Sequence, residues 1–70
     1  MDTKDVVAEL RSLGKSQAAI AAECQLSQGA ISHIETGRRK EVRASTHAKL
    51  MAALRKARQA HAAGLAANKP

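Results

Sequence analysis

The 70-residue sequence contains no Phe, Tyr or Trp, which limits the area that a hydrophobic core can bury. Sixteen residues are Ala, and after Met1 only thirteen are Val, Ile, Leu or Met. A chain of this length buries only about 60% of the surface that it exposes when unfolded. We therefore expect one small domain that is marginally stable alone and that a binding partner could stabilise further.

The sequence also lacks a signal peptide and any long apolar run, so it predicts neither secretion nor a membrane span. Its single cysteine, Cys24, excludes an intramolecular disulfide and fits a reducing compartment such as the cytoplasm. Cys24 shares a helical face with Ile20. We therefore expect a buried, inert thiol.

Acidic residues are almost absent from the second half of the chain. Residues 1–37 carry three cations and five acids, whereas residues 38–70 carry nine cations and one acid, Glu41. This asymmetry favours a polyanionic partner, either nucleic acid or an anionic membrane. A membrane binder would need a large face of Trp, Phe or Leu, and the C-terminal third offers Ala instead. Nucleic acid is therefore the expected partner.

Patterns typical of catalysis or metal binding are missing as well. His47 and His61 share a helical face but lie roughly 21 Å apart along it, too far to bind one metal ion. The sequence contains no phosphate-binding glycine loop, no paired carboxylates and no Ser–His–acid arrangement. We expect no enzyme activity, no cofactor and no small-molecule ligand.

Apolar residues recur at helical spacing in the first third of the chain. The pattern predicts one helix that is capped by Asp2 or Thr3 and stopped by Gly14. A second helix, capped by Ser16, should extend from Gln17 to about Cys24. The residues expected to face inward are Val6, Val7, Leu10, Leu13, Ile20, Ala21 and Cys24.

A third helix is predicted over residues 28–36, with Ser27 as its cap and Gly37 after its end. The charged connection RRKEVRAS leads to a fourth helix, which Ser45 or Thr46 should cap. The inward-facing residues of the fourth helix should be Leu50, Met51, Leu54 and Ala57, and the apolar stripe should end at Arg58.

The sequence thus predicts an all-α fold, a compact bundle of four or five short helices in one domain over residues 1–58. Residues 59–70 form an Ala-rich tail that is either a helical extension or disordered.

Only Gln25, Leu26 and the Ser27 cap separate the second and third helices, and so short a turn forces two helices to cross steeply. On the third helix, an apolar stripe of Ala30, Ile31 and Ile34 should face the core. A helix of this size fits the major groove of B-DNA. The residues predicted on its opposite, polar face are Gln28, Gly29, Ser32 and His33.

The segment SQAAIAAECQLSQGAISHIETGRR resembles helix-turn-helix proteins of the Cro and lambda-repressor (XRE-like) type. The residues on the family pattern are Gln17, Ile20, Ala21, Leu26, Ser27, Gln28, Ile31, Ser32, Ile34, Glu35 and Gly37. The chain departs from the family at Gln25, where Gly is usual because the turn takes positive φ, which costs another residue roughly 1 kcal/mol. It also lacks the Gly-Val-Ser start of the usual last helix.

The resemblance implies a DNA contact for nine residues, although a solvated surface is the alternative for each. The base-facing residues would be Gln28, Gly29, Ser32 and His33, with Gln28 able to bond bidentately to adenine. The phosphate-contacting residues would be Gln17, Arg38, Arg39, Lys40 and Arg43. Arg43 could instead enter a narrow minor groove.

The implied function is a sequence-specific regulator of transcription in a phage, plasmid or bacterial circuit, most simply a repressor that covers a promoter. The alternative is an antitoxin or adaptor that uses the same fold mainly for protein–protein interaction. One helix contacts about four to six base pairs, so a palindromic operator and a homodimer are expected. The heptad seam that could join two copies is weak, which predicts a dimer completed only on DNA. Its residues are Leu50, Leu54, Ala57, His61 and Gly64.

Overall fold

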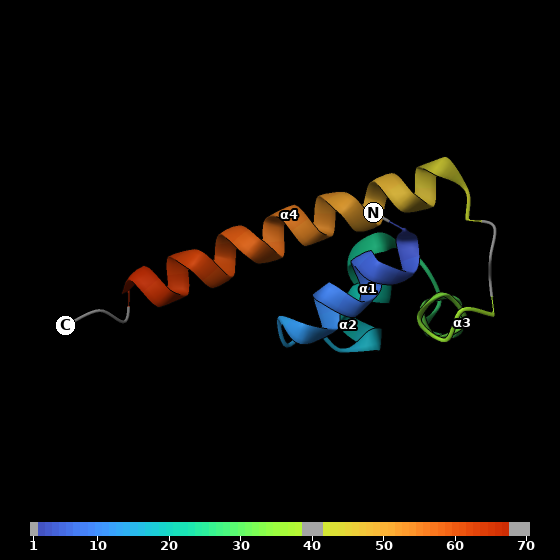
Figure 1. Ribbon diagram of the computed structural model, residues 1–70, viewed down its shortest axis with the longest axis horizontal. Coiled ribbons are helices and arrows are strands. Elements are labelled where there is room, and N and C mark those ends of the chain that lie inside the picture. The colour runs from blue at the N-terminus through green and yellow to red at the C-terminus, as the bar shows by residue number, and fades with distance from the viewer. Residues whose placement is uncertain (1, 39–41, 68–70) are drawn as a thin grey trace.

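The computed structural model describes the backbone of residues 2–38 and 42–67, with side chains as far as residue 62. Its four helices are shown in Figure 1. They are α1 (Thr3–Ser12), α2 (Gln17–Cys24), α3 (Gln28–Glu35) and α4 (Ala44–Ala67). These described residues form no strand, which confirms the predicted all-α fold.

Serine caps begin α2 and α3, as predicted. The Oγ of Ser16 accepts a hydrogen bond from the Ala19 N–H, and the Oγ of Ser27 accepts one from the Ala30 N–H, each at 3.1 Å. Each bond satisfies one of the N–H groups that the first turn of a helix leaves without a helical acceptor.

The predicted cap position is correct for α1 and wrong for α4. Asp2 occupies the N-cap position of α1 without a side-chain capping bond. The prediction that Ser45 or Thr46 caps α4 is wrong, because the helix already begins at Ala44 and both residues lie in its first turn. The His47 N–H donates to the Arg43 carbonyl at 3.0 Å, so the helical bonding starts before the predicted caps.

The same backbone motif ends α1, α2 and α3. In each, a residue with positive φ follows the helix, and the next N–H bonds to a carbonyl five residues earlier. The positive-φ residues are Gly14 (φ 90°), Gln25 (φ 58°) and Gly37 (φ 78°). For Gln25, the Leu26 N–H donates to the Ala21 carbonyl at 2.8 Å. Gln25 therefore carries the strained conformation that the family usually gives to glycine.

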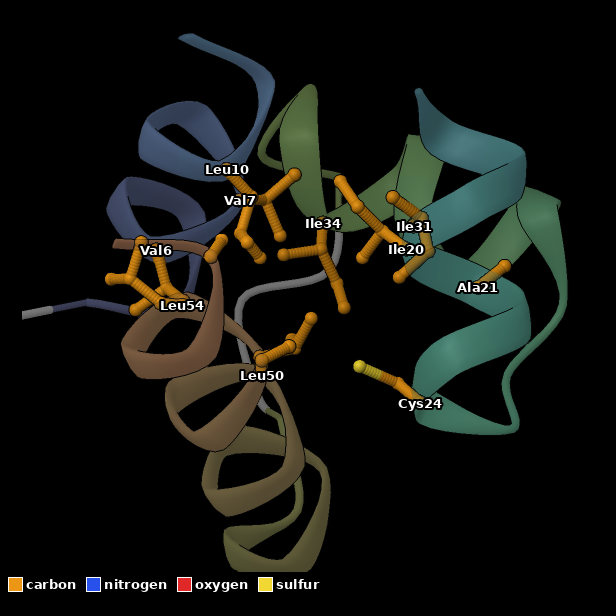
Figure 2. Close-up of a cluster of buried hydrophobic side chains, with 12 residues drawn as sticks. Val6, Val7, Leu10, Ile20, Ala21, Cys24, Ile31, Ile34, Leu50 and Leu54 are labelled. Carbon is orange, nitrogen blue, oxygen red and sulfur yellow. The ribbon is translucent and has the colours of Figure 1, made fainter. Parts of the chain in front are cut away.

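All four helices contribute to one hydrophobic core, shown in Figure 2. Helix α4 packs against α1 and α2, and α3 packs against the same two helices. The prediction for the inner faces holds, except that Leu13, Ala30 and Met51 are only partly buried and Ala53 is added. The buried residues are Val6, Val7, Leu10, Ile20, Ala21, Cys24, Ile31, Ile34, Leu50, Ala53, Leu54 and Ala57.

Helix α4 continues past the core as a single helix. Among the side chains that the structure describes, Ala57 is the last buried residue of α4, and Arg58 pairs with Glu9 of α1. From Arg58 to Ala67 the helix extends about 15 Å at 1.5 Å per residue, and Figure 1 shows this end projecting beyond the other helices. The structure describes α4 without a break as far as Ala67.

Replacing Gln25 with glycine should stabilise the protein by about 0.5–1 kcal/mol, because glycine adopts positive φ without steric cost. Chemical denaturation of the wild type and Gln25→Gly would measure the difference. Ala22→Gly is the matched control, since Ala22 is exposed inside α2 and glycine there should destabilise the protein by about 0.5–1 kcal/mol. Equal losses in both variants would contradict a strained Gln25.

Candidate nucleic-acid interface

The outer face of α3 carries the four residues predicted to face DNA bases. Gln28, Gly29 and His33 are exposed, and Ser32 is half-buried at the edge of the face. The hydrogen bonds of the described residues engage none of the Gln28, Ser32 or His33 side chains. Their polar atoms are therefore free to meet solvent or an external partner.

The opposite face of α3 is held by the core. Ile31 and Ile34 are 0% and 1% exposed, and they lie among side chains from the other three helices (Figure 2). Burying one isoleucine stabilises a fold by about 1.5–3 kcal/mol relative to exposing it. Rotating α3 about its axis would bring one or both isoleucines into water, so the direction of its outer face is set by the core.

A polar cluster fixes the C-terminal end of α3 to α1 and α2. Glu35 Oε1 accepts a hydrogen bond from Gln17 Nε2 at 3.1 Å and lies 3.4 Å from Arg11 Nε. The Glu35 side chain is 26% exposed and that of Arg11 is 42% exposed, so the cluster is only partly screened by solvent. The cluster therefore helps to fix the angle at which α2 and α3 cross.

Gln17 has a different side-chain environment from the one expected. It is the first residue of α2, as predicted, but its amide nitrogen donates to Glu35 within the protein. In this arrangement the Gln17 side chain helps to position α3. Only the backbone N–H groups in the first turn of α2 then remain to meet an external acceptor. Sequence reasoning missed this pairing because 18 residues separate the two side chains.

The described cations near α3 lie at both ends of its connection to α4. Arg38 is exposed directly after the turn at Gly37, and Arg43 is exposed directly before α4. Arg39 and Lys40, which were also predicted to contact phosphates, lie outside the described residues. The two described arginines therefore flank the C-terminal end of α3 and the N-terminal end of α4.

Lys4 is a further cation that the sequence reasoning did not select. Its Nζ lies 3.5 Å from the position that a Cβ would take at Gly37. The lysine thus sits beside the C-terminal end of α3, where a positive charge is favourable. The sequence contained no local signal for this position, because Lys4 belongs to α1 and meets Gly37 only in the folded chain.

Other chemistry has little support in the described residues. Cys24 is buried as predicted, and burial raises the pKa of its thiol, with Glu23 adding to the increase and Lys49 opposing it. In the part of the chain that the structure describes, no three His, Cys or acidic side chains gather to hold a metal ion. No described helix combines the length and apolar character needed to cross a bilayer.

The family model described as a helix-turn-helix domain matches residues 5–63. This range includes the α2–α3 unit, nearly all of α1 and most of α4. No curated protein and no solved structure matches the chain.

Removing the Glu35 carboxylate should destabilise the protein by about 0.5–1.5 kcal/mol, because Gln17 and Arg11 lose a common partner. Thermal or chemical denaturation of Glu35→Ala would measure the loss. Lys15→Ala is the control, since the Lys15–Glu23 pair is longer, at 3.8 Å, and similarly exposed. It should cost less than about 0.5 kcal/mol. Indistinguishable losses would show that the Glu35 cluster adds no more than a surface ion pair.

Proposed function

Because the chain belongs to the helix-turn-helix domain family, we propose that it binds double-stranded DNA at specific sequences and regulates transcription. The observation that carries this proposal is the outer face of α3, which is polar, exposed and backed by the buried Ile31 and Ile34. A helix held in this way can enter the major groove as a rigid reader. The excess of cations from residue 38 onward suits a polyanion.

The base-reading roles follow from the side chains on that face. The Gln28 amide can bond to N6 and N7 of adenine, and His33 can donate to an acceptor on guanine. Ser32 is short and half-buried, so its contribution to sequence preference is smaller. Gly29 lets the helix backbone approach the bases closely.

The phosphate contacts are assigned to the cations around the connection between α3 and α4. Arg38 and Arg43 are exposed at its two ends, and Lys4 lies beside Gly37. The proposal also includes Arg39, Lys40 and the first turn of α2 at Gln17. These groups neutralise backbone charge and set the register, with little information about sequence.

Repression by occlusion is the simplest form of this regulation, because DNA binding alone can cover a promoter. The proposed setting is the cytoplasm of a bacterium, at the nucleoid or on DNA of an infecting phage.

A weak homodimer completed on a palindromic operator is the proposed assembly. Leu50, Leu54 and Ala57, which begin the predicted seam, are buried in the subunit's own core. His61 is exposed and adds little apolar area to an interface. The contacts between copies are therefore assigned to the surface around α4 and its connection to α3.

Selection of bound sequences from random duplex DNA tests the proposed function directly. We expect an enriched palindrome with half-sites about 10 base pairs apart, the spacing of two recognition helices on one face of the duplex. Enrichment of a single half-site would retain sequence-specific binding and reject the dimer. Recovery of unenriched DNA would reject sequence-specific binding itself.

Gln28→Ala and Arg43→Ala should separate base reading from phosphate contact. Gln28→Ala should lose about 1–3 kcal/mol at one base pair per half-site and leave the other preferences unchanged. Arg43→Ala should weaken binding to all sequences similarly and lower the salt slope by about one per subunit. Affinities over a panel of operator variants at several salt concentrations measure both effects. If Gln28→Ala binds every operator variant with wild-type affinity, α3 does not read the DNA sequence as proposed.

Removal of residues 62–70 should leave folding and operator binding nearly intact, because the C-terminal end of α4 projects beyond the other helices (Figure 1). Sedimentation of full-length and shortened protein, alone and with operator DNA, would compare their assembly. A tight free dimer that is lost on shortening would instead assign the interface to the projecting end of α4.

A further inference from the structure

Gly29 lies on the centre line of the outer face of α3, in the first turn of the helix. At 100° per residue, the direction opposite the mean of Ile31 and Ile34 passes within about 10° of Gly29. His33 lies to one side of this line, and Ser32 and Gln28 lie to the other. The centre line of the proposed reading surface is therefore bare backbone at Gly29, with polar side chains on both sides.

The fold itself gives no reason for a glycine at this position. Gly14 and Gly37 have positive φ, whereas Gly29 lies within a helix and does not. A Cβ built on Gly29 would meet only the Ser27 Oγ, at 4.0 Å, which is an ordinary contact distance. Glycine in a helix is also less stable than alanine. The space beside Gly29 is thus open to a partner outside the chain.

We propose that the bare backbone at Gly29 receives the 5-methyl group of a pyrimidine in the major groove, an inference that rests on the proposed function. Gly29 is the second residue of α3, at the end of a recognition helix that meets base edges. The major groove presents hydrogen-bonding groups and one apolar group, the 5-methyl of thymine. A side chain of any size at position 29 would hold that methyl away from the helix.

With this contact, Gln28, Gly29 and His33 each recognise a different group on the base edges. Gly29 has no side-chain donor or acceptor, so it gains nothing by facing a purine edge. Its Cα–H group offers a small apolar contact, and the Gln28 and His33 side chains can bond to neighbouring base pairs. The methyl group belongs either to thymine or to 5-methylcytosine, which present it at the same ring position.

Methyl replacement in the DNA tests the contact. The probes are duplexes that carry the selected sequence, with each thymine replaced in turn by deoxyuridine and each cytosine by 5-methylcytosine. At one position per half-site, we expect loss of a thymine methyl to weaken wild-type binding, or gain of a cytosine methyl to strengthen it. The expected change is about fourfold for each buried methyl group.

Gly29→Ala should lose this methyl dependence and bind the methyl-bearing operator about tenfold more weakly, because the added Cβ takes the place of the methyl group. The same variant should melt at a higher temperature than the wild type, which excludes misfolding as the cause. Gln28→Ala is the control and should retain the methyl dependence while losing preference at a different base pair.

The outcomes separate this inference from the function on which it rests. A selected operator without any methyl-sensitive position, or unchanged methyl dependence in Gly29→Ala, would overturn the role of Gly29 and leave DNA reading by α3 in place. If no sequence is enriched in the selection, the proposed function itself fails before the methyl experiment is reached.

Discussion

The burial of Ile31 and Ile34 is the interaction on which the rest of this structure depends. Helix α3 has only eight residues, and an isolated helix of that length is unstable in water. Its two isoleucines join it to side chains of α1, α2 and α4 in the core (Figure 2). The same contact that makes α3 a helix also orients it, because the polar face can point only away from the buried pair. Stability and presentation of the candidate interface therefore have one cause.

A core without aromatic residues leaves much of the remaining stability to the ends of the helices. Serine caps begin α2 and α3, and a common backbone motif ends α1, α2 and α3. These ends keep the connections short, so α2 and α3 pack together without a long loop to order. Gln25 shows that the turn geometry is imposed by this packing, since the residue adopts φ 58° without the freedom of glycine.

Polar contacts between distant segments complete the support of α3. Glu35 contacts Arg11 and Gln17, so one carboxylate links three helices at the C-terminal end of α3. At the N-terminal ends of α1 and α4, Thr3 Oγ1 lies 2.7 Å from His47 Nδ1. Neither contact faces the outer surface of α3. The protein thus keeps its internal polar contacts separate from the side chains that we assign to a partner.

The sequence by itself determined the features that depend on near neighbours. Helical spacing identified the four helices and nearly all buried residues, and the capping preference of serine located the starts of α2 and α3. The polar face of α3 followed from the same spacing, because residues on one helix face are three or four positions apart. Only the tertiary structure decided the Gln17–Glu35 contact, the place of Lys4 beside Gly37 and the start of α4 at Ala44. The two contacts join residues far apart in the chain, and α4 begins without the side-chain cap on which a local prediction relies. The open space at Gly29 also needed the folded chain, since its lack of close neighbours appears only once the surrounding atoms are placed.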